Sequence, residues 1–281
     1  MALAFDKTAV ITGADSGLGR ALAIELAREG FRIGVLDVNM DEARKTVEMV
    51  ERAGGTGESF FCDVSDLEQV QAAADHFFDA WGKVGVLVNN AGIASFGVIG
   101  DLPIEEWRKV IDVDLWGVIY ECHAFVPSMK RQGGSHIINI ASMAGVTPPL
   151  EEGPYNAAKA VIYLSKTLKQ ELAPCDIGVT VVCPLGEKTN ILKSTDYAGE
   201  FILSMWEAAF EHQKLTPEEY ARRVVAAAGK DKLYFMPHAV GKFFWLNKRL
   251  APSGLIKALA WLNKKGLESR FCFLLARLGW M

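Results

Sequence analysis

Short apolar runs alternate with longer amphipathic stretches over most of this chain. Six runs of five to seven residues are rich in β-branched side chains and almost free of charge: residues 8–12, 32–37, 58–63, 84–89, 136–142 and 178–183. Such runs are typical of strands that are buried on both faces of a parallel sheet. A further run, residues 232–237, predicts a last strand, which makes about seven in all.

The stretches between these runs have the apolar period of helices, most clearly at residues 41–53, 66–81, 104–131 and 155–173. Asp66 is a suitable N-cap, and the charges of Glu105 and Glu106 suit a helix N-terminus. The strict alternation of strand and helix predicts an α/β fold with a doubly wound parallel sheet. In such folds ligands bind at the carboxyl ends of the strands.

Composition and charge narrow the class of protein. Half of the 281 residues are apolar, so the chain can bury a large core. The net charge of -4 is unevenly spread, because residues 230–281 carry +8 and the rest of the chain carries -12. The five cysteines lack CxxC spacing, so we expect neither a disulfide framework nor a metal site. No signal segment or bilayer-spanning apolar stretch is evident, and we expect a cytoplasmic protein.

The first chemical signal is the turn TGADSGLG, residues 12–19, which follows the first predicted strand and opens the first helix. Gly13, Gly17 and Gly19 allow a tight turn and a close approach to a pyrophosphate, whose charge the helix N-terminus would meet. Asp37 ends the second strand, where its carboxylate would accept hydrogen bonds from ribose hydroxyls and repel a 2′-phosphate. The pattern therefore predicts a dinucleotide site that prefers NAD to NADP.

Four motifs together resemble the classical short-chain dehydrogenase/reductase (SDR) family: the glycine turn, NNAG at residues 89–92, Ser142 in NIASMAG, and YNAAK at residues 155–159. The resemblance runs from about residue 8 to residue 236. It implies a nicotinamide-dependent alcohol–ketone interconversion in one Rossmann-like domain, here residues 1–238. It also implies a homo-dimer or homo-tetramer that is assembled through the helices at 104–131 and 155–173.

The same resemblance implies cofactor-binding roles for the residues at the matching positions. These are Gly13, Ser16, Gly17, Leu18, Gly19, Asp37, Asp63, Val64, Asn90, Ala91, Gly92, Tyr155, Lys159, Pro184 and Thr189. For the strand-end residues among them, plain turn chemistry is the alternative role.

The predicted catalytic residues are Ser142, Tyr155, Lys159 and Asp114. Hydride removal from an alcohol requires a base for the hydroxyl proton, and a tyrosine with a pKa of about 10 is a poor base at neutral pH. Lys159 lies four residues after Tyr155, so both side chains share one helix face, and its charge is expected to lower the pKa of Tyr155. Ser142 would stabilise the charge that develops on the substrate oxygen.

Two positions depart from the family pattern. Asp114 stands where the family usually has asparagine, and its charge could pair with Lys159 and weaken the effect of that lysine on Tyr155. We therefore expect a displaced pH optimum. After the sixth strand, Leu185 and Glu187 replace a glycine and an aliphatic residue, which predicts a shifted loop path. A weakly active or inactive dinucleotide-binding scaffold stays open as the alternative.

The family places a variable substrate lid at residues 186–215, and here that segment is rich in apolar side chains. An apolar lid favours a hydrophobic substrate such as a steroid, retinoid, terpenoid or long-chain alcohol or ketone. The alternative is an amphipathic helix that packs on the body of the protein.

Residues 239–281 form a basic extension beyond the last strand. Three amphipathic helices are predicted, at 240–250, 253–265 and 267–278, with tryptophans and lysines interspersed among aliphatic residues. Basic residues beside aromatic ones are typical of a helix that lies on a membrane surface. Packing on the body, or on a second subunit as a clamp in a soluble oligomer, is the alternative. The dense aliphatic faces argue against nucleic acid as the partner.

Overall fold

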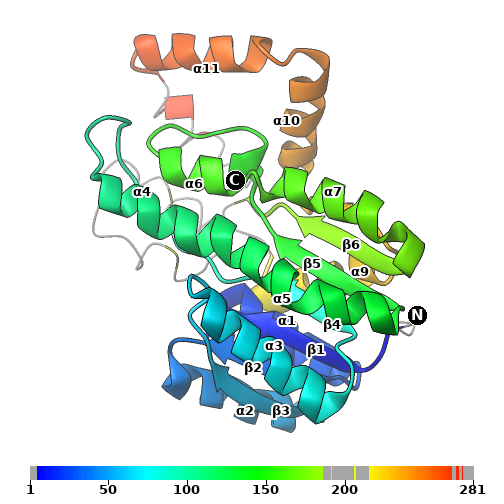
Figure 1. Cartoon of the computed structure of the whole chain (residues 1–281). Helices are drawn as coiled ribbons and strands as arrows, with labels where there is room; N and C mark the ends of the chain where they lie inside the picture. Colours follow the sequence, from blue (N-terminus) through cyan, green and yellow to red (C-terminus); the bar gives the residue numbers. More distant parts are fainter. Residues whose placement is uncertain are drawn as a thin grey trace.

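The computed structural model describes residues 5–185, 191, 206, 215–267, 270, 271 and 274. In this part of the chain seven strands form one sheet in the order β3-β2-β1-β4-β5-β6-β7, and every neighbouring pair is parallel (Figure 1). The strands are β1 (Thr8–Thr12), β2 (Arg32–Asp37), β3 (Thr56–Phe61), β4 (Val86–Asn89), β5 (Ser135–Ile140), β6 (Ile177–Val182) and β7 (Tyr234–Phe235). The predicted doubly wound, Rossmann-like sheet is thereby confirmed.

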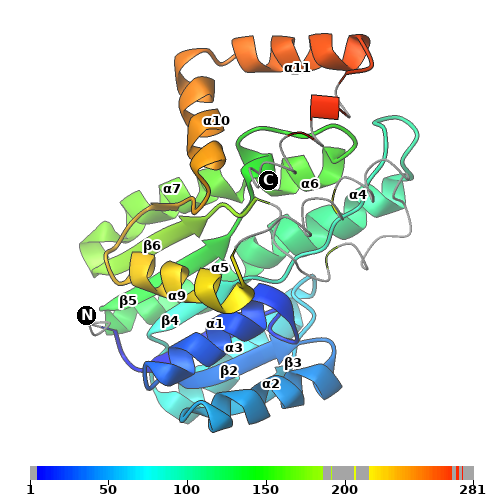
Figure 2. The same ribbon diagram turned by 180° about the vertical axis from the view of Figure 1, so that it is seen from behind.

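Helices cover both faces of the sheet, as Figures 1 and 2 show from opposite sides. One face carries α3 (Leu67–Trp81), α5 (Gly117–Gln132) and α7 (Val161–Leu172), and the other carries α1 (Gly17–Arg28), α2 (Met40–Arg52) and α9 (Pro217–Ala228). Each layer encloses its own apolar cluster against the sheet, and the strands contribute alternate side chains to the two clusters. Double burial explains why the central strands β1 and β4 are mostly apolar, whereas β3 at the sheet edge is only partly buried and carries Glu58 and Ser59.

Local signals in the sequence determine where several helices begin. Asp66 caps α3 by accepting hydrogen bonds from the backbone N–H of Glu68 at 2.9 Å and of Gln69 at 3.3 Å. Thr216 caps α9 in the same way, with Glu219 N at 3.2 Å.

The expected continuous helix over residues 104–131 is wrong. The structure has α4 (Ile104–Ile111), then a π-helical turn η1 (Asp112–Trp116), and then α5. A π-turn widens the helix by one residue and is frequent at functional sites. Here it includes Asp114, whose side chain it directs into the protein interior.

The expected helix over residues 155–173 is also divided, into α6 (Gly153–Ala158) and α7. The break falls at Lys159, whose carbonyl oxygen would lie 2.3 Å from a Cβ placed on Gly145. Gly145 belongs to the 3₁₀ turn η2 (Met143–Gly145), which follows Ser142. The close approach of these two backbones therefore joins the segment of Ser142 to the segment of Tyr155 and Lys159.

The basic extension begins with α10 (Ala239–Leu250) and α11 (Gly254–Lys264), close to the predicted bounds of the first two helices. In Figures 1 and 2, α10 leaves the body beside α7 and α11 crosses above it. The predicted third helix, over residues 267–278, falls mostly outside the described residues. None of the helices in the described part of the chain is long and apolar enough to cross a membrane.

Candidate active site

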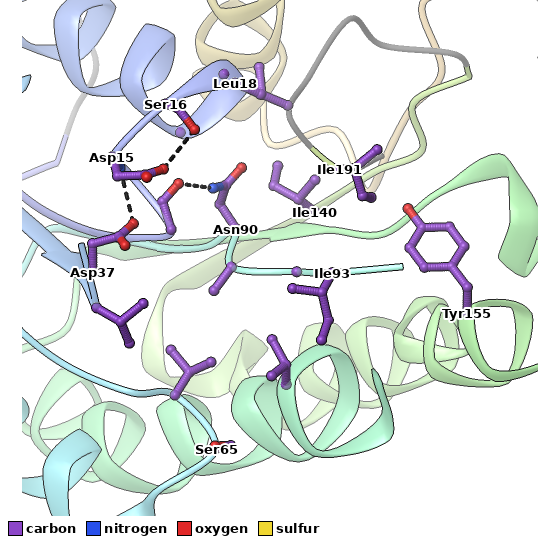
Figure 3. A pocket seen from close by; sticks show the side chains of 18 of the residues that line it. Asp15, Ser16, Leu18, Asp37, Ser65, Asn90, Ile93, Ile140, Tyr155 and Ile191 are labelled. Atoms are coloured by element: carbon purple, nitrogen blue, oxygen red, sulfur yellow. Dashed lines mark hydrogen bonds between the residues drawn. The ribbon is translucent and has the colours of Figure 1, made fainter. Parts of the chain in front are cut away.

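A cavity of about 630 Å³ opens where the strands end (Figure 3). Its lining includes one residue from just after, or at the end of, each of β1 to β6: Gly13, Asp37, Asp63, Asn90, Ser142 and Pro184. Strand order reverses on the two sides of β1, and this switch point is where open α/β sheets bind their ligands. The cavity therefore lies where the fold predicts it.

The glycine turn forms the floor of one end of the cavity. Gly13 has a φ of +59°, and a Cβ on Gly19 would lie only 2.4 Å from the Gly13 carbonyl oxygen, so neither position accepts a side chain without a shift. Asn90 holds the turn, because its Nδ2 donates to the carbonyl oxygens of Thr12 at 2.9 Å and Gly13 at 2.8 Å. Ser16, Gly17 and Leu18 line the cavity at the N-terminus of α1, whose dipole favours an anion there.

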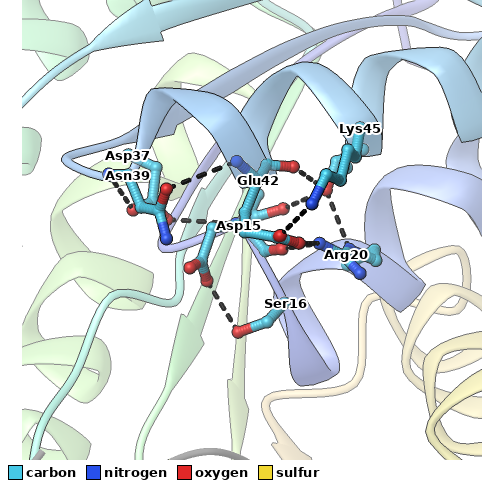
Figure 4. Close-up of polar contacts among 9 residues, drawn as sticks. Asp15, Ser16, Arg20, Asp37, Asn39, Glu42 and Lys45 are labelled. Atoms are coloured by element: carbon cyan, nitrogen blue, oxygen red, sulfur yellow. Dashed lines mark hydrogen bonds and ion pairs between the residues drawn. The ribbon is translucent and has the colours of Figure 1, made fainter.

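Asp37 lies beside this turn. Its carboxylate accepts hydrogen bonds from the backbone N–H groups of Asp15 at 3.0 Å and Asn39 at 2.9 Å (Figure 4). Burial raises the pKa of Asp37, the N–H of Asn39 lowers it, and the charge of Asp15 raises it again. The carboxylate is thus fixed in orientation at the rim of the cavity, where a ribose would lie against it.

The two cations closest to this carboxylate in Figure 4 are directed elsewhere. Arg20 and Lys45 both pair with Glu42, with N···O distances of 2.8 Å and 2.5 Å. Arg20 also donates from Nε to the hydroxyl of Thr46 at 2.9 Å. Because Glu42 neutralises Arg20 and Lys45, an anion beside Asp37 would meet the acids Asp15 and Asp37 without a free cation from this pair.

The residues that were predicted to bind the adenine end of the cofactor also line the cavity. Asp63 and Val64 line the cavity, as do Ala91 and Gly92. The Asp63 carboxylate accepts hydrogen bonds from the backbone N–H of Ser65 at 2.9 Å and from its hydroxyl at 2.6 Å. Turn chemistry thus accounts for part of the role of Asp63, as the sequence allowed.

Ser142, Tyr155 and Lys159 meet at the other end of the cavity. The Lys159 ammonium lies 5.1 Å from the centre of the Tyr155 ring, and the Ser142 side chain hydrogen-bonds with Tyr155. Figure 3 shows the Tyr155 hydroxyl directed toward Ile191. A hydroxyl donor, a phenol and an ammonium group are thereby assembled from β5, α6 and the residue that ends α6.

Asp114 is the fourth member of this group. Its Oδ2 lies 2.8 Å from Lys159 Nζ, and both side chains are almost fully buried. The other oxygen, Oδ1, accepts a hydrogen bond from the backbone N–H of Ile93 at 2.7 Å. Lys159 Nζ also lies 3.4 Å from the Ile140 carbonyl oxygen. The expected ion pair between Asp114 and Lys159 is therefore present.

The charge of Lys159 lowers the pKa of Tyr155, as expected, but the net shift of that pKa is upward. Burial raises the pKa of Tyr155 above its ordinary value of 10.0, and this outweighs the lowering by the charge of Lys159. The charges of Asp114 and Glu152 raise it further, whereas the Ser142 hydrogen bond lowers it. Burial also acts to lower the pKa of Lys159, but Asp114 and Tyr155 hold it above its ordinary value.

The sequence reasoning missed Glu152, which precedes α6 and is almost fully buried near Tyr155. Burial raises the pKa of Glu152 to about 8, while hydrogen bonding with Trp206 lowers it. Within the part of the chain that the structure describes, its Oε1 has no hydrogen-bond partner. A second buried acid, Glu121 of α5, lies against Thr12 with its pKa raised to about 8. A glutamate within an otherwise apolar helix face was the available signal for Glu121.

Several predictions concern the segment after β6. Pro184 lines the cavity, and its carbonyl accepts from the backbone N–H of Met143 at 2.9 Å. Leu185 packs its side chain against the core. Thr189, Glu187 and most of the expected lid at 186–215 lie outside the described residues. From that lid, Ile191 and Trp206 line the cavity beside Tyr155.

Comparisons with known proteins agree with this geometry. The family model for short chain dehydrogenase matches residues 7–198. The uncharacterized oxidoreductase YxbG of Bacillus subtilis is 40% identical over 276 residues, which cover 95% of this chain and 96% of that protein. Trans-4-hydroxycyclohexanecarboxylate dehydrogenase of Sinomonas cyclohexanicum is 38% identical over 66% of this chain and 73% of that protein.

Among solved structures, a short chain dehydrogenase/reductase of Burkholderia phymatum in complex with NAD is similar with a TM-score of 0.82. It is 31% identical, and the match covers 89% of this chain and 95% of that one. A metagenomic short-chain oxidoreductase in complex with NADP has a TM-score of 0.69 and 28% identity, over 82% and 95% of the two chains. With its fold, its strand-end cavity and a family match over more than half its length, this chain belongs to the short-chain dehydrogenase/reductase family.

Proposed function

We propose that the protein is an NAD-dependent dehydrogenase that interconverts a hydrophobic secondary alcohol and its ketone. The observation that carries this proposal is the arrangement of one cavity with Asp37 at one end and Tyr155, Ser142 and Lys159 at the other. The cavity fits a dinucleotide, because the backbone at Gly13 and Gly19 is bare and a helix N-terminus faces the space.

Bound NAD would supply the hydride acceptor in this site. Asp37 would bind the adenosine ribose, and the pairing of Arg20 and Lys45 with Glu42 favours a 2′-hydroxyl over a 2′-phosphate. Asp63, Val64 and the residues of the glycine turn would hold the remainder of the dinucleotide. Relatives with NAD and with NADP are both known, so this preference rests on the chemistry of Asp37.

Tyr155 takes the hydroxyl proton of the alcohol as the carbon loses its hydride, which leaves the ketone. Ser142 donates a hydrogen bond to the same oxygen. Lys159 stabilises the tyrosinate through its charge, and Asp114 holds Lys159 in position at 2.8 Å. The proton then passes from Tyr155 to solvent, and the reverse sequence reduces the ketone.

The walls around Tyr155 support an apolar substrate. Ile93, Ile140, Ile191 and Trp206 line this end of the cavity. A hydrophobic ring or chain would bury its surface against them at about 25 cal/mol per Å². Trans-4-hydroxycyclohexanecarboxylate, for which one relative is named, is a secondary alcohol on a saturated ring that also carries a carboxylate, so this relative supports the alcohol–ketone reaction and not the apolar class.

The proposal is tested with a panel of secondary alcohols, from cyclohexanols to steroids, retinoids, terpenoids and long-chain alkanols, with NAD and NADP in parallel and NADH fluorescence as the readout. We expect turnover with NAD that rises with substrate hydrophobicity and is lost in Tyr155→Phe. Binding of NADH without turnover of any alcohol or ketone would support the non-catalytic scaffold instead. A higher kcat/KM with NADP would contradict the assigned role of Asp37.

A further inference from the structure

The outer face of α10 exposes three large apolar side chains. Phe243, Leu246 and Leu250 are 57%, 49% and 77% exposed, and their spacing of three and four residues places them on one face. The opposite face already packs on the body, through buried Val240 and Gly241. The packing of α10 on the body therefore leaves this apolar face exposed.

Cations flank this face. Lys242 and Arg249 are exposed on α10 beside the three apolar residues, and the guanidinium of Arg249 lies 4.7 Å from the ring centre of Trp245. In sequence, residues 239–267 contain six lysines or arginines and no acid. The surface thus combines exposed apolar groups with positive charge that no acid within residues 239–267 neutralises.

The second helix of the extension continues the same surface. None of its residues in α11 is buried, and Ile256 and Trp261 are exposed beside Lys257 and Lys264. In Figures 1 and 2, α11 stands clear of the sheet and its covering helices. Two consecutive helices therefore present apolar and cationic side chains to the outside.

We propose that α10 and α11 form a docking surface for an anionic lipid membrane. Apolar side chains of this kind enter the headgroup region, and each Lys or Arg near an anionic leaflet adds attraction. A two-fold contact with a second copy would instead set the same cations against each other, with no acid on the helices to neutralise them.

The docking surface and the cavity share one end of the molecule. A Cβ on Gly241 would lie 3.2 Å from the Sδ of Met143, the residue that follows Ser142. The inner face of α10 thus rests on the turn that positions the catalytic serine. Where the proposed function holds, a docked enzyme would receive its hydrophobic substrate from the lipid rather than from water.

The test is co-sedimentation of the full-length protein with vesicles of phosphatidylcholine alone or mixed with phosphatidylglycerol. We expect binding to the anionic vesicles that weakens at high salt. The double variant Lys242→Glu/Arg249→Glu should reduce that binding by roughly tenfold or more. Lys130→Glu/Arg131→Glu on α5 changes the net charge equally at another place and should leave the binding unchanged.

A second pair of variants tests the apolar contribution. Phe243→Ser/Leu246→Ser should weaken vesicle binding, whereas Phe61→Ser should not, although Phe61 of β3 is also exposed, at 51%. Equal binding of the wild type to both kinds of vesicle, or binding unaffected by either α10 variant, overturns the proposal. The proposal is also overturned if gel filtration shows that these variants dissociate an oligomer while vesicle binding is unchanged.

Vesicle binding needs no turnover, so its failure is distinguishable from failure of the proposed reaction. A lipid-docking protein without dehydrogenase activity would bind anionic vesicles and leave every alcohol unchanged. A dehydrogenase without a docking surface would oxidise water-soluble alcohols and remain in the supernatant.

Discussion

Lys159 and Asp114 form a buried ion pair, with 2.8 Å between Nζ and Oδ2, and Lys159 Nζ lies 5.1 Å from the ring centre of Tyr155. An amide at position 114 would hold the lysine through a hydrogen bond and leave its charge free to act on Tyr155. The carboxylate neutralises part of that charge, and in addition raises the pKa of Tyr155 directly. The single change from amide to acid thus acts twice on the proposed base.

Replacement of Asp114 by asparagine should therefore lower the pKa of Tyr155. Alcohol oxidation requires the ionised phenol, so its rate rises as pH increases through that pKa. The variant should reach its plateau at lower pH and be faster at neutral pH, by about tenfold for each unit of displacement. The measurement is the pH dependence of kcat/KM.

Asp101→Asn is the matched control, because it removes an exposed acid from outside the cavity lining. Its profile should follow that of the wild type. If Asp114→Asn also gives an unchanged profile, the pair does not control Tyr155.

Much of the fold and of the cavity follows from the sequence. The bounds of β1 and β2 are those predicted, because each apolar run stops where turn residues and charges begin. Gly13, Asp37, Asn90 and Ser142 come together because parallel strands end at one edge of the sheet. The clustering of these four residues could therefore be predicted without knowing how the side chains pack.

The remaining features depend on three-dimensional packing. A π-turn at Asp112–Trp116 has no apolar period of its own, so an amphipathic pattern continues through it without interruption. The raised pKa of Tyr155 is the result of opposing effects, of which burial is the largest, and burial at that residue depends on the whole fold. Glu151 and Glu152 are adjacent and identical, yet only Glu152 is fully buried.

Asp37 provides a test of cofactor choice. Asp37→Ala removes the carboxylate that would bind the ribose hydroxyls, and loss of hydrogen bonds to a charged group costs about 1.5–3 kcal/mol. We expect the Kd for NADH to rise by roughly 10- to 100-fold and the discrimination against NADPH to fall. Fluorescence titration with both dinucleotides gives the two constants.

Asp41→Asn is the control for Asp37, because it neutralises an exposed acid on α2 that pairs with Arg44. It should leave both dissociation constants unchanged. An Asp37→Ala protein with wild-type affinity for NADH would mean that the ribose lies elsewhere.

Ionisation of Glu121 should destabilise the folded protein as the pH rises above about 4.5. Its pKa is about 8 in the folded protein, against an ordinary value of 4.5, because burial disfavours the charge. The folded state therefore holds a proton that the unfolded state releases, so this acid makes stability fall as pH rises from about 4.5 to 8. Glu121→Gln should increase the free energy of unfolding by about 2–4 kcal/mol at pH 8 and change it little at pH 4.

Denaturant unfolding at several pH values measures this difference. Glu171→Gln, an exposed position on α7, should give no gain at either pH. A Glu121→Gln protein that gains equally at acidic and alkaline pH would show that packing, and not titration, is responsible.

Glu152 should act on Tyr155 only at alkaline pH. Because burial raises the pKa of Glu152 to about 8, the group is neutral below that pH and repels the tyrosinate only above it. Glu152→Gln removes this repulsion, so the pH profile of alcohol oxidation should match that of the wild type below pH 8 and rise above it at higher pH. Glu151→Gln is the neighbouring control and should follow the wild type throughout. A Glu152→Gln profile that is displaced equally at all pH values would require the acid to be ionised below its raised pKa, and would contradict its burial in a neutral form.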